Sequence, residues 1–154
     1  MKHLTESTYH KIIITTDMIL TRTVYLIYPV LLVYLAIKRE PAILQALLVP
    51  GISFILVSVF RYYLNAPRPY EVLGKDPIIP RKGKGKSFPS RHTFSTFVIA
   101  VTVFYFWPVA GILTGVAGAL LASVRVLGGV HYVRDVIAGA LIGIGCGLIG
   151  FYLI

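Results

Sequence analysis

Long uncharged runs separated by short charged segments are the feature that most restricts how this chain of 154 residues folds. The chain is 56% hydrophobic, and its mean hydropathy is +0.80. A composition this apolar is typical of a protein that lies in a lipid bilayer, where backbone polar groups must be bonded inside helices or closed barrels. We therefore predict an all-α fold, a polytopic transmembrane helical bundle.

The uncharged runs predict about five spans. They cover residues 23–37, 42–60, 93–107, 109–124 and 135–154. A helix needs about 20 apolar residues to cross a bilayer, so the first span is expected to extend back past Arg22. Residues 1–21 carry mixed charge, and we expect them to lie on the membrane surface and lead into that span. The chain is interpreted as one domain, 1–154, with a catalytic core at about 42–154.

Composition excludes several classes of site. The only cysteine, Cys146, permits no disulfide within the chain, and the acidic residues and histidines do not cluster as metal ligands, so we predict no metal and no cofactor. The net charge is +9, but no nucleic-acid recognition module is visible. Anionic membrane lipids or a phosphorylated substrate fit this charge better. Gly139, Gly143 and Gly147 recur every four residues and predict close helix packing.

Polar residues gather where the apolar runs begin or end. In an up-and-down bundle, the ends of the second and fourth spans and the starts of the third and fifth spans meet at one membrane face. The residues at these ends are Arg61, Arg68, Ser90, His92, Arg125, His131 and Asp135. Charged residues at the edge of a hydrocarbon layer are costly and mark functional candidates. We therefore predict an active site at that face.

This set of residues suits phosphoryl chemistry. Forked arginine donors match the several oxygens of a phosphoryl group, and Ser90 adds its hydroxyl at the start of a helix. Asp135 lies one helical turn after His131 and would orient its imidazole, which favours His131 as the nucleophile. His92 would then protonate the leaving oxygen, and water would later hydrolyse the phosphohistidine.

Three ordered motifs strengthen this interpretation. They are Arg61-x6-Arg68-Pro69, Pro89-Ser90-Arg91-His92 and Arg125-x5-His131-x3-Asp135. Their order and spacing resemble those of the type 2 phosphatidic acid phosphatase family, the lipid phosphate phosphatases related to vanadium haloperoxidases. The motifs of that family are Lys-x6-Arg-Pro, Pro-Ser-Gly-His and Ser-Arg-x5-His-x3-Asp.

The resemblance implies the same roles for these residues, with three departures. Arg61 replaces a lysine and keeps its charge. Arg91 replaces a glycine and is a further candidate phosphate ligand. Val124 replaces the serine before Arg125. Five spans in place of the usual six imply a shortened amino-terminal end.

One basic segment, Arg81–Ser87, superficially resembles a nucleotide-binding P-loop. Pro80 stands where that motif requires its first glycine, and no buried strand precedes it. We therefore interpret the segment as a solvated loop that touches anionic headgroups.

Several functions agree with these observations. The leading hypothesis is a metal-independent membrane phosphatase for a lipid phosphate or diphosphate, with undecaprenyl diphosphate as the first candidate. The alternatives are phosphatidylglycerol phosphate or phosphatidic acid as substrate, phosphotransfer to another hydroxyl, and lipid-phosphate binding or transport without catalysis. We expect a bacterial cell membrane protein. The basic loops place the site in the cytoplasm by the positive-inside rule, but because that charge has a substrate-binding explanation and many relatives act outside, we favour the extracytoplasmic side.

Overall fold

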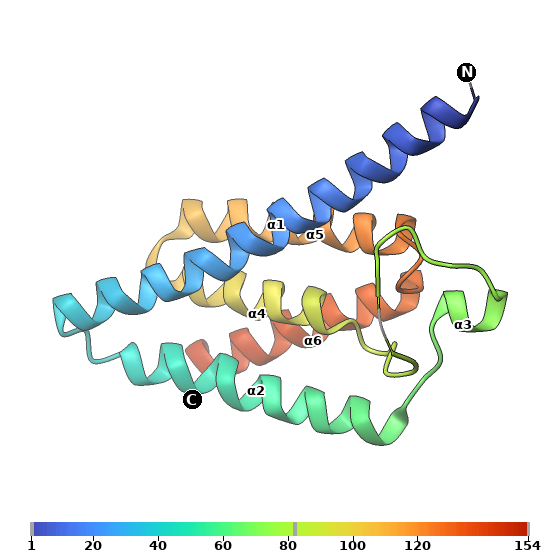
Figure 1. Ribbon diagram of the computed structural model, residues 1–154. Coiled ribbons are helices and arrows are strands. Elements are labelled where there is room, and N and C mark those ends of the chain that lie inside the picture. Colours follow the sequence, from blue (N-terminus) through green and yellow to red (C-terminus); the bar gives the residue numbers. More distant parts are fainter. Residues whose placement is uncertain (1, 82, 154) are drawn as a thin grey trace.

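Helices make up almost the whole of the described chain. The computed structural model describes residues 2–81 and 83–153, with side chains from Glu6 onward. The helices within these residues are α1 (Lys2–Lys38), α2 (Ile43–Leu64), α3 (Pro69–Leu73), α4 (Arg91–Phe106), α5 (Pro108–Leu127) and α6 (Val133–Tyr152). The five long helices alternate in direction, and the short α3 lies at one end of the bundle (Figure 1). The all-α membrane bundle predicted from the sequence is confirmed.

The number and extent of the spans differ from the prediction. Within the described residues, four segments are long and apolar enough to cross a membrane: Glu6–Lys38, Ile43–Leu73, Pro108–Leu127 and Val133–Tyr152. The predicted third span is α4, which has only 16 residues. The predicted end of the last span, at Ile154, lies outside the described residues.

The prediction for the amino-terminal segment is wrong. Residues from Lys2 onward belong to α1 instead of forming a separate surface segment before a span. The buried positions Ile13, Asp17 and Val24 continue the face that packs against the rest of the bundle. The charge of Asp17 is paired with Arg125, so it does not interrupt the helix. The polar residues that suggested a surface segment are therefore accommodated on one long helix.

Helix α4 is the centre of the bundle. It packs most extensively against α6 and α5, and more than half of its residues are buried. A Cβ added at Gly139 or Gly143 would lie 2.6 Å from the carbonyl oxygen of Ser90 or 2.5 Å from that of Phe94. Glycine is therefore required there for the close approach of α6 to α4, as the four-residue spacing predicts.

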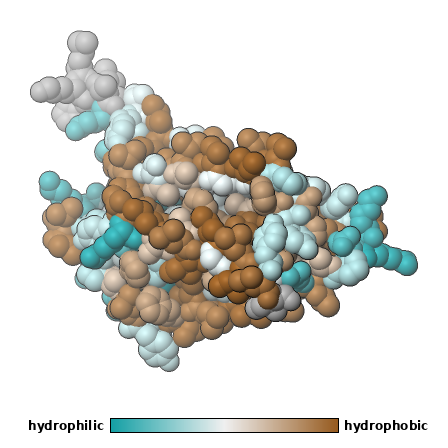
Figure 2. Space-filling view, turned by 180° about the vertical axis from the view of Figure 1, so that it is seen from behind, coloured by the Kyte–Doolittle hydropathy of each residue, from teal (hydrophilic) through white to brown (hydrophobic). Residues whose placement is uncertain are grey.

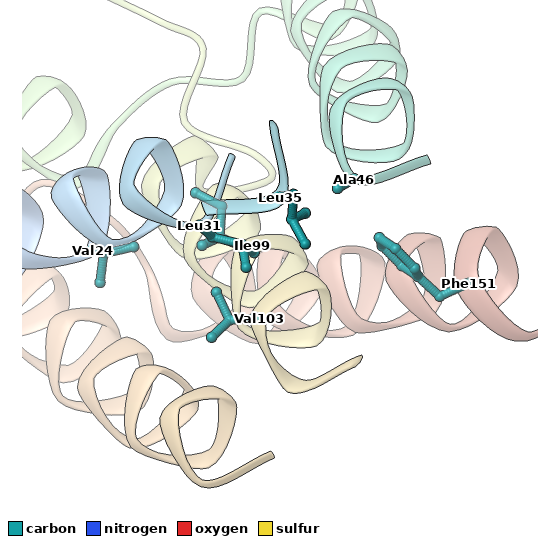
Figure 3. Close-up of a cluster of buried hydrophobic side chains, with 7 residues drawn as sticks. All are labelled: Val24, Leu31, Leu35, Ala46, Ile99, Val103 and Phe151. Atoms are coloured by element: carbon teal, nitrogen blue, oxygen red, sulfur yellow. The ribbon is translucent and has the colours of Figure 1, made fainter. Parts of the chain in front are cut away.

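At the end of the bundle opposite the charged loops, the helices are held together by apolar packing. The cluster in Figure 3 joins side chains of α1, α2, α4 and α6. Its buried members are Val24, Leu31, Leu35, Ala46, Ile99, Val103 and Phe151. On the outside, apolar residues cover the middle of the face seen in Figure 2, and polar residues gather towards the two ends. This distribution is that of helices crossing a hydrocarbon layer.

Candidate active site

The polar residues predicted from the sequence meet at one end of the bundle. Arg61 lies in the last turn of α2, and Arg125 in the last turn of α5. Ser90 precedes α4, and Asp135 lies in the first turn of α6. These helix ends lie beside α3 and the long loop that follows it (Figure 1). Alternation of helix direction therefore brings together motifs that are far apart in the chain.

His131 and Asp135 form the buried centre of the site. The His131 Nδ1 atom lies 3.4 Å from Asp135 Oδ2. His131 is 2% exposed and Asp135 is fully buried. The same carboxylate oxygen accepts hydrogen bonds from the backbone N–H of Tyr132 at 3.1 Å and from the hydroxyl of Ser87 at 2.5 Å. These donors fix the carboxylate, which in turn orients the imidazole through Nδ1.

The other ring nitrogen of His131 faces an arginine. Arg68 Nη1 lies 3.4 Å from His131 Nε2 and donates to the carbonyl of Val130 at 2.8 Å. With the Nδ1 proton directed at Asp135, Nε2 carries the lone pair. Burial, partly opposed by the hydrogen bond to Asp135, lowers the pKa of His131 to about 4. The imidazole is therefore neutral at pH 7, which is the state that a nucleophile requires.

Arg61 and Arg68 are positioned by the loop before α4. Arg68 donates from Nε to the carbonyl of Gly85 at 3.0 Å and from Nη2 to that of Lys86 at 3.1 Å. Arg61 donates to the carbonyls of Lys86 and of Ser87, the latter at 3.2 Å. Each guanidinium carries five N–H donors, so both retain donors for a phosphoryl group.

This loop is only partly the predicted solvated segment, because Gly83, Lys84 and Lys86 are exposed but two other residues are not. Gly85 and Ser87 are buried, and the N–H of Gly85 donates to Glu71 Oε1 at 2.7 Å. The backbone of Ser87 is also bonded to the carbonyl of Ala66 at 2.9 Å. Carbonyl groups facing two buried arginines draw the chain inward, which its basic composition did not indicate. Lys82, within the same segment, lies outside the described residues.

His92 lies on a more open side of the site. Its ring stacks on that of Tyr25, with centroids 6.2 Å apart and planes at 24°. Arg91 is exposed, and its guanidinium lies 5.7 Å from the centre of the Phe54 ring. The groups that act electrostatically on His92 include Arg125, Arg91 and His131. The structure thus gathers both histidines and the arginines in one electropositive region.

Arg125 is paired with a residue that the sequence analysis left outside the site. Its Nε lies 2.7 Å from Asp17 Oδ1, and its Nη2 donates to Asp17 Oδ2 at 3.2 Å. Arg125 is 5% exposed and Asp17 is 9% exposed. The pair joins the end of α5 to α1.

Ser90 connects two helices through its backbone. Its backbone N–H donates to the backbone carbonyl of Asp135 at 2.8 Å, which joins the starts of α4 and α6. Its hydroxyl accepts a hydrogen bond from Thr93 at 3.0 Å. This leaves the hydroxyl hydrogen of Ser90 available to a ligand.

Sequence reasoning missed Ser87 and Asp17. Both contacts are distant in sequence: Ser87 is 48 residues from Asp135, and Asp17 is 108 residues from Arg125. No local signal singled out either residue, because Asp17 is one of several charged residues within 1–22 and Ser87 ends a basic segment. Within the described residues, no group of three or more histidine, cysteine, aspartate or glutamate side chains is arranged to hold a metal ion.

The fold and the site define a multi-pass membrane protein with a buried histidine–aspartate pair among arginines. Residues 42–154 match the model of the PAP2 superfamily, and the chain belongs to that family. The chain is 32% identical over 121 residues to an undecaprenyl-diphosphatase of Sulfolobus acidocaldarius, an alignment that covers 77% of this chain and 59% of the relative. It is 41% identical over 66 residues to the bacitracin transport permease protein BcrC of Bacillus licheniformis, covering 43% of this chain and 32% of that protein. The chain thus spans about three-fifths of the first relative and a third of the second.

Two solved structures share the fold. The crystal structure of LpxE from Aquifex aeolicus superposes with a TM-score of 0.71 at 28% identity and covers 93% of this chain and 92% of its own. A PAP2-type phosphatidylglycerolphosphate phosphatase from Bacillus subtilis also gives a TM-score of 0.71, at 22% identity, covering 92% and 74% of the two chains. The arrangement of helices is therefore that of membrane proteins of this family.

Proposed function

We propose that this protein is a membrane phosphatase that hydrolyses a lipid phosphate or diphosphate through a phosphohistidine on His131. The observation that carries the proposal is the geometry around His131. Asp135 holds Nδ1, and Arg68 lies 3.4 Å from the opposite nitrogen, where an incoming phosphoryl group would be bound and attacked. Membership of the PAP2 superfamily supports the same chemistry.

In the first step, His131 Nε2 attacks phosphorus. The Nε2–P bond forms as the bond from phosphorus to the leaving oxygen breaks, and His92 gives that oxygen a proton. Arg61, Arg68 and Arg125 stabilise the charge on the phosphoryl oxygens. Arg125 and Arg91 act on His92 with positive charge, and the negative charge of the bound substrate would offset them and favour the protonated form of His92.

In the second step, water replaces the imidazole. His92, now neutral, takes a proton from the water as its oxygen bonds to phosphorus, and the Nε2–P bond breaks. Inorganic phosphate leaves, and His131 returns to its neutral state. The Nδ1–H group of His131 donates a hydrogen bond to Asp135 throughout, and the carboxylate stabilises the positive charge that develops on the ring.

An apolar groove beside His92 supports a lipid substrate. The attacking and leaving groups lie on opposite sides of phosphorus, so the lipid chain leaves on the side of His92. A groove of about 500 Å³ between α1, α2 and α4 lies there. Its lining includes Tyr25, which stacks on His92, and Phe54, which lies under Arg91. A phosphate among the arginines and a hydrocarbon chain in this groove would fit one lipid molecule.

Undecaprenyl diphosphate is the first candidate substrate. The 32% identity with an undecaprenyl-diphosphatase supports it. Phosphatidylglycerol phosphate is the second candidate, because the fold also matches that of a phosphatidylglycerolphosphate phosphatase. Absence of metal from the mechanism is part of the proposal and is tested by chelation.

The site is proposed to face the extracytoplasmic side of a cell membrane. Lys84→Cys, in a Cys146→Ala background, places one thiol at an exposed position of the loop beside the site, and Glu40→Cys places one just after the carboxyl end of α1. We expect a membrane-impermeant maleimide to label Lys84→Cys in intact cells and to leave Glu40→Cys unlabelled. The reverse pattern would place the site in the cytoplasm. The bacterial origin stays a prediction.

The function is tested by phosphate release from purified protein in detergent, with EDTA present. The substrates are undecaprenyl diphosphate, phosphatidylglycerol phosphate and phosphatidic acid, and wild type is compared with His131→Ala. We expect release that survives EDTA, is greatest with undecaprenyl diphosphate and is lost in the variant.

Three other outcomes have distinct meanings. Release abolished by EDTA would contradict the metal-free mechanism. Equal release by His131→Ala would remove His131 as the nucleophile. Binding of the lipids without any release would favour the alternative of a binding or transport protein.

A further inference from the structure

We infer that Asp17 of α1 is a positioning residue of the active site, which acts by holding Arg125 in the orientation that binds the phosphoryl group. This inference rests on the proposed function. Asp17 precedes the residues 42–154 that match the family model. It therefore belongs to a part of the chain that the family motifs do not describe.

The contact has the geometry of a specific pair. Asp17 binds one edge of the guanidinium, with Oδ1 at 2.7 Å from Nε and Oδ2 at 3.2 Å from Nη2. The Nη2 contact is a hydrogen bond and the Nε contact is a close ion pair, and together they hold the carboxylate against one edge of the guanidinium. Both side chains are almost completely buried, so solvent competes little for either charge.

The pair leaves the other edge of Arg125 free. Its described contacts use Nε and Nη2, and Nη1 is bonded to no residue within 6–81 or 83–153. Arg125 acts electrostatically on both His92 and Arg68, which lie on opposite sides of the site. Its unused Nη1 donors are therefore available to a phosphoryl group bound between them.

The carboxylate also offsets repulsion. Arg125 shares the site with Arg68 and Arg81, and their positive charges act on one another. Without Asp17, a buried Arg125 would be repelled by these groups and would lose the hydrogen bond and the ion pair that restrain its orientation. Helix α1 is anchored elsewhere by Val24, Leu31 and Leu35, which lie in the apolar cluster. Its packing therefore has a support that is independent of the ion pair.

The test compares Asp17→Asn, which keeps the shape and removes the charge, with wild type. The control is Glu40→Gln, an exposed carboxylate at the far end of α1. Two quantities are measured: kcat for the lipid substrate, and the Kd of inorganic phosphate by titration calorimetry. Melting temperature is recorded for each variant.

We expect Asp17→Asn to lower kcat by about 10- to 100-fold, the usual loss when the residue that orients a ligating side chain is removed. The Kd of phosphate is expected to rise about tenfold, and Glu40→Gln is expected to resemble wild type. In an Arg125→Ala background, Asp17→Asn should cause no further loss of kcat, because it acts through Arg125.

Unchanged kcat and an unchanged Kd of phosphate in folded Asp17→Asn, with only a lower melting temperature, would overturn the inference and leave the pair as an anchor of α1. If Asp17→Asn does not fold, Asp17→Glu replaces it, because a shift of one methylene disturbs orientation while keeping the charge. Several-fold weaker phosphate binding by Asp17→Glu would support positioning, and wild-type binding would overturn it.

The phosphate measurement also separates the two proposals. Wild-type protein that hydrolyses none of the lipids contradicts the proposed phosphatase function, while the difference in phosphate affinity between wild type and Asp17→Asn still decides the role of Asp17. Equal affinity in the two proteins, including no measurable binding by either, overturns the inference.

Discussion

The two sides of the site are held in different ways. The His131 side comprises Arg61, Arg68, Ser87, His131 and Asp135. Every side chain on this side is buried and makes hydrogen bonds of defined geometry. On the His92 side, which comprises Tyr25, Arg91, His92 and Arg125, the contacts are mainly aromatic stacking, a cation over a ring and one ion pair to α1. Arg91 and Tyr25 are also exposed.

This difference indicates that the two sides have different roles in the proposed reaction. A nucleophile must be oriented before the substrate arrives, and the fixed bonds around His131 provide that orientation. A leaving group must enter and depart, and a side that borders an apolar groove permits this movement. We therefore expect substitutions on the His131 side to lower kcat and those on the His92 side to affect KM as well.

The largest effect is expected from Asp135→Asn. An amide donates as well as accepts, so it would hold His131 in the wrong tautomer and would not stabilise the imidazolium-like state. We expect kcat to fall by about 10³- to 10⁴-fold with little change in KM. Asp76→Asn, in the exposed loop after α3, is the control. A loss below about tenfold would show that the contact at 3.4 Å does not orient the nucleophile.

A smaller effect on the same side is expected from Ser87→Ala. Its hydroxyl donates to Asp135 Oδ2 at 2.5 Å, and two donors remain on that oxygen without it. One hydrogen bond to a charged group contributes about 1.5–3 kcal/mol, which corresponds to about 10- to 100-fold in kcat if the whole bond serves orientation. Ser123→Ala, an exposed serine of α5, controls for the loss of a hydroxyl. Equal kcat in the two variants would remove Ser87 from the site.

On the His92 side, Tyr25→Leu is expected to raise KM about threefold, because an aromatic contact contributes about 0.5–1.5 kcal/mol beyond its buried area. Tyr34→Leu is the matched control, since Tyr34 packs on Trp107 at the other end of the same helix, with ring centroids 5.0 Å apart. Steady-state kinetics with the lipid substrate measure both variants. A fall in kcat with unchanged KM would contradict the division between the two sides.

The smallest effect concerns pH. The pKa of His131 is lowered to about 4, so the neutral nucleophile persists as pH falls from 7 to 5, and half of kcat/KM should be lost only near pH 4. An acidic limb near pH 6.5 would contradict this environment for His131.

The same shift affects stability in acid. The unfolded chain binds a proton on this histidine below about pH 6.5, whereas the folded protein does so only near pH 4. The stability of the folded protein should therefore fall as the pH is lowered from about 6.5 to about 4. Melting temperatures recorded at each pH separate unfolding from titration of the site.

The motifs predicted most of the polar residues that meet at this end of the bundle, because their spacing relates directly to helix geometry. His131 and Asp135 are four residues apart, and the structure places their side chains in contact. The meeting of the four charged helix ends was also predictable, since the long helices of an up-and-down bundle alternate in direction. The extent of α1 and the burial of the loop at Gly85 and Ser87 were not, because local composition there was polar.

The sequence by itself determined that this chain forms apolar helices, where their charged ends lie, and which histidine has an aspartate partner. These properties depend on hydropathy and on spacing along one helix, which a linear pattern records. Only the tertiary structure decided that Arg125 is paired with Asp17, and that Ser87 is turned towards Asp135. Contacts between residues 48 and 108 positions apart depend on how whole helices pack, and no local pattern specifies that packing.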